Sequence, residues 1–254
     1  MGFADLHIHS IYSSDGTSTI PAILKHVSTK TDISVIAITD HDTMEGTKES
    51  MDLAPQYGLK AIPGCEISTA DGHLLALFIE RPIPSGRSLV DSVLMVADQG
   101  GVCIAAHPTA RGTPSLRFET IFEALWVPCV RSTLVGIEAF NGGLVYTRSN
   151  PMVTAMARML PLAKVGNSDA HVLAMIGHGS TEFEGSSIKN LRRALETGTT
   201  TVRYGQGLDG FGVLKTYIPQ YILRKMGWAA WNSGPQAPVK YVRLTSLALN
   251  NEAA

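Results

Sequence analysis

The chain has 254 residues, of which 44% are apolar and 17% are charged, and its formal net charge at pH 7 is −1. This composition excludes a disordered, a collagen-like or a disulfide-stapled chain and provides enough apolar material for one full-sized core. The lack of net positive charge argues against a dedicated surface for duplex nucleic acid.

Cysteine usage and hydropathy indicate where the protein resides. Cys65, Cys103 and Cys129 are odd in number and widely spaced, which favours reduced thiols over a disulfide framework or a zinc finger. The sequence begins without a signal-like segment, and no run of eighteen apolar residues occurs in it. We therefore expect a cytoplasmic protein that neither crosses nor binds a membrane.

Short apolar runs alternate with amphipathic stretches along the chain. The expected strands are Gly2–Ile8, Ile33–Thr39, Lys60–Ile67, Leu74–Ile79, Gly101–Ala106, Leu134–Phe140, Ala163–Asn167 and Thr200–Tyr204. The expected helices are Ile20–Lys30, Thr43–Tyr57, Ser88–Gln99, Leu116–Trp126, Asn150–Leu160 and Ile188–Thr197. This order predicts a mainly parallel sheet with helices outside it, and an irregular β/α barrel is its natural closure.

The last part of the chain departs from this order. After Gly205 the sequence is rich in glycine, and Phe211–Trp231 is expected to form one or two helices interrupted by Pro219. We therefore divide the chain into a barrel domain, residues 1–204, and a C-terminal accessory helical extension, residues 205–254. A helical tail of this kind usually packs on the domain or makes an oligomer contact, so we assign it no chemistry.

Side chains that bind metals follow the ends of the expected strands. His7 and His9 close the first strand, and their spacing of two points both imidazoles to one side. His41, Glu66, His107, Asp169 and His171 likewise fall at the ends of later strands. In a β/α barrel these ends meet at the face that carries the active site.

Each of these residues alone has an ordinary structural explanation, such as a helix cap or a hydrogen-bonded loop histidine. Together they would place carboxylates and imidazoles at one point, which is destabilising unless cations neutralise them. Mixed imidazole and carboxylate ligands suit Zn, Mn or Fe better than Ca. The pattern therefore favours a metal centre.

Five segments, in this order, resemble the successive motifs of the PHP family, which is named for polymerase and histidinol phosphatase domains. They are Asp5-Leu-His-Ile-His9, Thr39-Asp-His-Asp-Thr43, Gly64-Cys-Glu-Ile-Ser68, Ala106-His-Pro108 and Ser168-Asp-Ala-His171. The resemblance covers about the first 200 residues. It implies an α/β fold, a distorted seven-stranded barrel whose mouth binds two or three divalent metal ions and hydrolyses phosphoesters.

The resemblance also implies a ligand set. One metal would be held by His7, His9, Glu66 and Asp169, and Glu66 would bridge to a second metal held also by His107. A third would be held by Asp15, His41 and His171. Asn141 stands where other branches of the family place a further histidine, so it is included as a weaker ligand. Asp5, Asp40 and Asp42 flank the ligands and are expected to orient their imidazoles.

The chemistry follows from the charges. Such ions would make a bridging water acidic and supply a metal-bound hydroxide for attack on phosphorus. Arg111 and Arg148 are candidates for binding the substrate phosphate, and His178 is a candidate general acid or a turn residue. His26 and His73 are interpreted as structural.

The favoured function is metal-dependent hydrolysis of a phosphoester in a small substrate, such as a nucleotide, a nucleoside bisphosphate or a short 5′-phosphorylated oligonucleotide. Only 61 residues separate His107 from Asp169, so the insertion that shapes the pocket of many nucleotide-specific members is missing. The alternatives are a histidinol-phosphate phosphatase, an amidohydrolase-like metal hydrolase and a non-catalytic metal-stabilised module. The amidohydrolase alternative is weakened because no lysine ends a central strand.

Overall fold

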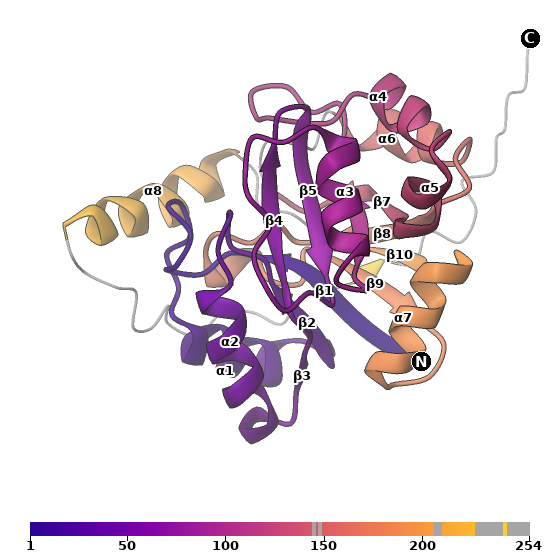
Figure 1. The fold of residues 1–254 in the computed structure, drawn as a ribbon. Helices are drawn as coiled ribbons and strands as arrows, with labels where there is room; N and C mark the ends of the chain where they lie inside the picture. Colours follow the sequence, from indigo (N-terminus) through magenta and orange to yellow (C-terminus); the bar gives the residue numbers. More distant parts are fainter. Residues whose placement is uncertain (144–145, 147–148, 206–209, 227–240, 243–254) are drawn as a thin grey trace, which may run out of the picture.

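The computed structural model describes residues 1–143, 146, 149–205, 210–226 and 241–242, whose strands form two hydrogen-bonded sheets (Figure 1). The first contains, in order across the sheet, β11 (Tyr241–Val242), β10 (Thr201–Gly205), β9 (Gly179–Phe183), β1 (Gly2–Ile8), β2 (Val35–Ile38) and β3 (Lys60–Ala61). The second contains β4 (Gly64–Thr69), β5 (Gly72–Leu77), β6 (Val102–Ala105), β7 (Leu134–Asn141) and β8 (Ala163–Asn167).

The helices that pack against these sheets are α1 (Ile20–Lys30), α2 (Glu45–Leu53), α3 (Leu89–Ala97), α4 (Phe118–Ala124), α5 (Pro128–Thr133), α6 (Asn150–Ala157) and α7 (Ile188–Thr197), with 3-10 turns η1 (Ala54–Tyr57) and η2 (Leu173–Met175) (Figure 1). A last helix, α8 (Gly210–Lys225), lies apart from the sheets. The predicted α/β class is confirmed, and β1, α1, β8 and α7 have the predicted bounds. Within the described ranges, none of the helices has the length and apolar content needed to cross a lipid bilayer.

Two isolated bridges join the sheets. Ile8, at the end of β1, pairs in parallel with Ala170, which follows β8. His41, which follows β2, pairs in parallel with Glu66 of β4. Among the described residues, no continuous ladder closes the two sheets into a ring. Both bridges involve segments that carry predicted metal ligands, so the sheets are held together at the end where these ligands lie.

Proline explains two departures from the predicted elements. The predicted strand Lys60–Ile67 is two strands, β3 and β4, which belong to different sheets and are separated by Ile62 and Pro63. The predicted helix Thr43–Tyr57 is α2 followed by η1, which contains Pro55. Proline has no backbone N–H, so it cannot donate to a strand ladder or to an α-helical carbonyl.

Strand direction is the larger departure. β5 is antiparallel to both β4 and β6, whereas the sequence predicted a mainly parallel sheet. Only two residues separate β4 from β5, too few for the crossover that a parallel pair needs. β9 was not predicted, because Gly-Ser-Thr-Glu-Phe has neither an apolar run nor clear alternation, and it pairs antiparallel with β1 and β10.

The C-terminal extension contributes to both the sheet and the surface. The predicted boundary at residue 204 falls inside β10, and β11 pairs antiparallel with the end of β10. α8 runs through Pro219 as one helix and ends at Lys225, whereas the predicted end, Trp231, lies outside the described residues. In Figure 1, α8 lies beside the segment between β1 and α1.

Candidate metal centre

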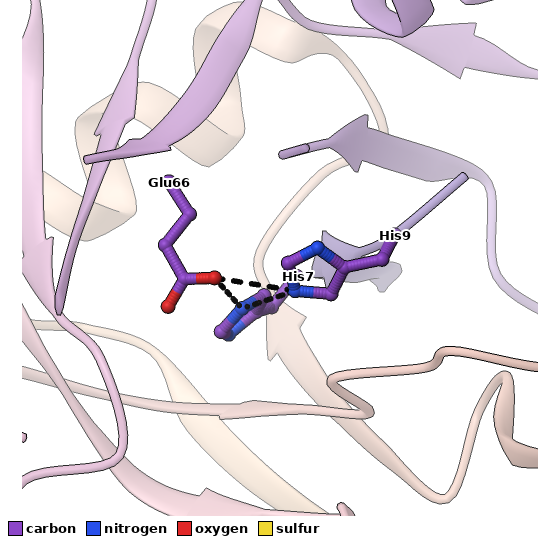
Figure 2. A group of neighbouring side chains, drawn as sticks. All are labelled: His7, His9 and Glu66. Atoms are coloured by element: carbon purple, nitrogen blue, oxygen red, sulfur yellow. Dashed lines mark hydrogen bonds and ion pairs between the residues drawn. The ribbon is translucent and has the colours of Figure 1, made fainter. Parts of the chain in front are cut away.

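The site begins at the end of β1, where strand alternation points His7 and His9 the same way. Their Nε2 atoms lie 3.1 Å apart, and both lie close to one oxygen of Glu66. The distances to Glu66 Oε2 are 3.1 Å from His7 and 3.2 Å from His9 (Figure 2). All three side chains are buried. The predicted convergence of β1 and β4 on one point is therefore present in the structure.

Glu66 is the centre of the cluster, because imidazoles surround both of its oxygens. Oε2 also lies 3.3 Å from His41 Nδ1. Oε1 lies 3.1 Å from His107 Nε2 and 3.0 Å from His73 Nδ1. A carboxylate with a separate set of imidazoles at each oxygen has the arrangement expected of a bridging ligand.

His73 was interpreted as structural from the sequence, yet it faces Glu66. It lies near the start of β5, and since β5 runs antiparallel to its neighbours, its start lies at the end where theirs terminate. The register places His73 opposite Ser68, at the site end of β4. The signal that could have identified it is the short connection between β4 and β5, which requires a hairpin.

Asp169 joins the two parts of the site. Its Oδ1 lies 3.1 Å from His9 Nε2, 3.4 Å from His7 Nε2 and 3.6 Å from His171 Nδ1. Asp169 and His107 both have positive backbone φ, 48° and 26°. This conformation is uncommon outside glycine and often marks functional positions, where surrounding contacts hold it.

A second, more exposed part of the cluster contains Asp15. Its Oδ2 lies 3.1 Å from His171 Nε2 and 3.5 Å from His41 Nε2. The side chains of Asp15, His41 and His171 are 20 to 31% exposed, whereas that of Glu66 is fully buried. The structure thus brings the predicted third group of ligands together at the solvent-facing side of the cluster.

Four histidines have Nε2 3.1 Å from an oxygen of Glu66, Asp169 or Asp15, and each also has a hydrogen-bond partner at Nδ1. Nδ1 of His7 lies 2.9 Å from Glu138, that of His9 3.3 Å from Ser13, and that of His107 3.1 Å from Ser115. Nδ1 of His171 lies 2.9 Å from the backbone oxygen of Asp169. A hydrogen bond at one ring nitrogen fixes the ring and leaves the other nitrogen available as a ligand.

Glu138 was not predicted as a site residue, although it accepts four hydrogen bonds at the base of the cluster. Its Oε1 accepts from His7 Nδ1 at 2.9 Å and from Asn167 Nδ2 at 2.7 Å. Its Oε2 accepts from the His107 backbone N–H at 2.7 Å and from Asn141 Nδ2 at 2.9 Å. A charged residue in the otherwise apolar run Gly136–Phe140 was the signal for it.

Asn141 lies within the cluster, with its amide group donating to the carboxylates. Its Nδ2 donates to Glu138 and, at 3.2 Å, to Asp169 Oδ2. Its Oδ1 accepts from the Gly143 backbone N–H at 2.7 Å. In this orientation the amide oxygen faces Gly143, and the ligand role of Asn141 stays a prediction.

The three flanking aspartates do not orient the imidazoles as expected. Asp5 accepts from the Ser168 backbone N–H at 3.0 Å, Asp40 from the Ser10 backbone N–H at 2.6 Å, and Asp42 from the Ser68 backbone N–H at 2.8 Å. They therefore fix the loops that follow the strands. The carboxylate that holds an imidazole ring is Glu138 instead.

The cluster is strongly coupled electrostatically. Burial alone would raise the pKa of Glu66, but the charges of His7 and His41 hold it well below its usual value. Burial alone would lower the pKa of His9, but Asp169 and Glu66 raise it to about 10. Buried carboxylates of this kind remain ionised only where positive charge accompanies them.

The same residues fit divalent metal ions. Ligand atoms within 4.8 Å of one another occur in several groups, among them His7, His9 and Glu66; His7, His107 and Asp169; His9, Asp15 and His41; His9, Asp169 and His171; and His41, Glu66 and His73. His41 Nδ1, His73 Nδ1 and Asp169 Oδ1 are buried and face opposite charge without hydrogen-bond geometry. Buried ligand atoms that point to one place without hydrogen-bonding to one another are expected where a protein binds a cation.

The remaining predicted residues lie elsewhere. Arg111 is exposed on the loop after His107, and Arg148 lies outside the described residues. His178 is buried, and no described interaction joins it to the cluster. Burial lowers its pKa to about 4, and the nearby His26, also buried, has its pKa lowered to about 4 by burial and by the charge of Lys30. The catalytic role of His178 stays a prediction.

Comparisons with known proteins agree with this geometry. The family model described as PHP domain matches residues 5–183. A protein of Methanocaldococcus jannaschii described as uncharacterized is 34% identical over 147 residues, which are 54% of this chain and 81% of that protein. A 5′-3′ exoribonuclease of Haemophilus influenzae is 26% identical over 198 residues, which are 76% of this chain and 63% of that protein.

A similar solved structure is a two-domain protein of Bacteroides vulgatus that contains a predicted PHP-like metal-dependent phosphoesterase. It aligns with a TM-score of 0.63 at 21% identity and covers 80% of this chain. This chain spans 64% of that protein. The likeness shows a shared fold, and the resemblance expected from the five motifs is confirmed by the family match.

Replacing Glu138 by glutamine should weaken divalent metal binding, although Glu138 contacts no predicted metal directly. Whichever way the amide turns, its NH2 group would face two donors, so either the His7 ring or the His107 backbone would lose its acceptor. Loss of such support typically weakens metal binding 10- to 100-fold. Calorimetric titration with Mn²⁺ measures this, with Glu184→Gln, which alters an exposed carboxylate, as the control. Equal affinity in both variants would contradict the assigned role.

Acid should destabilise the metal-free protein through His26 and His178. Their pKa values are about 4 in the folded protein and near 6.5 when unfolded, so the unfolded chain takes up more protons between these values. Stability is therefore lost as pH falls from 6.5 toward 4, by about 1 to 2 kcal/mol per histidine at pH 5. Urea unfolding at pH 5 and pH 7.5 should show a smaller difference for His178→Gln than for the unmodified protein. An unchanged difference would exclude His178 as a source of acid sensitivity.

Proposed function

Because the chain belongs to the PHP domain family, we propose that its histidine and carboxylate cluster holds two or three divalent metal ions and hydrolyses phosphoesters. The observation that carries this proposal is the position of Glu66. It is fully buried, and five imidazoles lie within 3.3 Å of its two oxygens. Such a concentration of ligand atoms is difficult to account for as a purely structural polar core, since each group must be compensated.

Three groups of residues would hold the ions. The first contains His7, His9, Glu66 and Asp169; the second contains Glu66, His107 and, as the structure adds, His73; the third contains Asp15, His41 and His171. These imidazole and carboxylate ligands suit Mn, Zn or Fe. Bound there, the ions would acidify water and stabilise negative charge on a phosphoryl group.

The chain's own residues position this chemistry. Glu138 fixes the His7 ring and the His107 backbone, and Tyr146 stacks on the His107 ring with centroids 4.8 Å apart. Cys65 and Cys103 are buried, and burial raises the pKa of Cys65 to about 12, so neither is a reactive nucleophile. The third cysteine, Cys129, is exposed on α5, and no described contact joins it to the cluster. These features support direct attack by water over a covalent intermediate.

The substrate that we favour is a nucleotide, a nucleoside bisphosphate or a short 5′-phosphorylated oligonucleotide. The similarity to the Haemophilus exoribonuclease over 76% of this chain supports a nucleotide substrate. Arg111 is exposed on the loop after His107, where its guanidinium is free to bind two phosphate oxygens. Single strands fit a net charge of −1 better than a duplex does.

We extend the proposal to the fold that holds the site. Strands β1, β2, β4, β5, β6, β7 and β8 follow one another around the cluster, and the bridges Ile8–Ala170 and His41–Glu66 connect the two sheets at their junctions. In this proposal these seven strands would form the predicted distorted barrel, with closure confined to the metal end. This arrangement would explain the residues in the two β-bridges: His41 and Glu66 are predicted ligands, and Ile8 and Ala170 lie next to predicted ligands.

The purified protein with added Mn²⁺ should hydrolyse a generic aryl phosphate, and chelation should abolish this activity. Glu66→Gln should lower both the bound metal per chain and turnover, because it removes the charge shared by two groups of ligands. Metal analysis and the rate of aryl alcohol release measure both effects, with Glu45→Gln, on the surface of α2, as the control. Activity that survives exhaustive chelation would contradict the metal mechanism, and unchanged metal content in Glu66→Gln would contradict the bridge.

Substrate class is tested by comparing kcat/KM for nucleoside bisphosphates, mononucleotides, 5′-phosphorylated oligonucleotides and histidinol phosphate. We expect one of the nucleotide substrates to exceed the aryl phosphate and histidinol phosphate by at least tenfold. Arg111→Ala should reduce this preference, since part of the phosphate contact is lost. Preference for histidinol phosphate would favour the alternative phosphatase.

A further inference from the structure

Helix α8 contacts the loop that carries Asp15, although it lies outside the segment matched to the PHP domain, residues 5–183. Arg224 Nη2 donates to the Ile11 backbone oxygen at 2.8 Å, and Nη1 donates to the Gly16 backbone oxygen. The Tyr217 hydroxyl donates to the backbone oxygen of Asp15 itself at 3.2 Å. Residues 217 and 224 are two helical turns apart, so they lie on one face of α8.

The loop has little regular structure of its own. Residues 11–15 form turns and bends between β1 and α1, residues 16 and 17 have no regular structure, and the Asp15 side chain is 31% exposed. Thr17 is tied to the backbone oxygen of His171 through its N–H at 3.0 Å and its hydroxyl at 2.8 Å. The described contacts of the Asp15 and Gly16 carbonyls with side chains come from α8. The Asp15 side chain is thus held by Ser13 and His171, and its backbone oxygen is held by α8.

The contacts of α8 with this loop are polar, while large apolar side chains elsewhere on the helix stay in solvent. Phe211, Leu214 and Met226 are each at least 68% exposed. The Gln220 side-chain oxygen, on the same face as Tyr217 and Arg224, lies 3.4 Å from the Thr17 hydroxyl oxygen. The ring of Tyr217 also stands edge-on to His171, with centroids 6.1 Å apart. The α8 side chains that contact the rest of the protein therefore lie next to the predicted third group of ligands, which contains Asp15 and His171.

We propose that α8 is a clamp that sets the affinity of the metal held by Asp15, His41 and His171, with Arg224 and Tyr217 as positioning residues. This inference rests on the proposed metal centre. If α8 favours the loop conformation that binds the ion, the bound ion must favour the docked α8 to the same degree, because coupling between two sites is reciprocal. The C-terminal extension would then act on the outer ion and leave the two inner ones unaffected.

The test is a Mn²⁺ titration of the full chain by calorimetry and by the electron paramagnetic resonance of bound Mn²⁺. Arg224→Ala and Tyr217→Phe should each weaken one class of site by at least about fivefold and leave the tighter classes unchanged. Lys215→Ala, at an exposed position of the same helix, is the matched control. A purely packing role for Arg224 would lower stability without changing Mn²⁺ affinity, and that result would overturn the proposal.

Asp15→Asn separates this inference from the proposed function. If Asp15→Asn loses one ion while Arg224→Ala and Tyr217→Phe lose none, the metal centre stands and the clamp is wrong. If Asp15→Asn changes no site, the third ion itself is wrong and the clamp fails with it.

Hydrogen exchange provides a second measurement that does not depend on a variant of α8. Mn²⁺ should slow amide exchange across Gly210–Lys225 in the unmodified protein and should not do so in Asp15→Asn. If Mn²⁺ changed amide exchange in α8 equally in both proteins, the coupling between the outer ion and α8 would be absent and the proposal would be overturned.

Discussion

The structure depends on one electrostatic constraint: Glu66, Glu138 and Asp169 are carboxylates with almost no exposure, and each must be compensated inside the protein. Glu138 is compensated by four hydrogen-bond donors, so it needs no cation. Only one of these donors is an imidazole, whereas five imidazoles face Glu66 and three face Oδ1 of Asp169. The difference separates a carboxylate that supports the site from two that are available to a metal.

The fold satisfies this constraint by bringing strand ends together. His7 lies at the end of β1 and His9 follows it, His41 follows β2, and Asp169 follows β8. The hairpin of β4 and β5 adds both Glu66 and His73. The two bridges between the sheets lie at the same end, so the backbone is fixed where the side chains must meet. The positive φ angles of His107 and Asp169 show that local backbone preference is overridden there.

The sequence pattern predicted those features of the structure that depend mainly on residues close together in the chain. Alternation along β1 and the motif at its end placed His7 and His9 correctly, and α1 and α7 had clear periodicity. His73 was missed because its role depends on the antiparallel direction of β5. Glu138 was missed because its role depends on which groups pack against the middle of β7. Both are properties of the tertiary structure. The aspartates next to the ligands were assigned by sequence proximity, but their hydrogen bonds go to backbone amides of other loops. The contact of α8 with Asp15, about 200 residues apart in the chain, has no sequence signal.

Burial divides the cluster into two parts with different expected behaviour. His7, His9, Glu66 and Asp169 are almost inaccessible, so ions held there would exchange slowly and contribute to folding stability. The side chains of Asp15, His41 and His171 are 20 to 31% exposed, so an ion held by them would face solvent and substrate. Since charge near solvent is better screened, that outer ion would also be the more weakly held. The outer group is also where α8 makes its polar contacts, so under the proposed clamp a change in the C-terminal extension would alter the affinity for the outer ion and leave the buried centre unchanged.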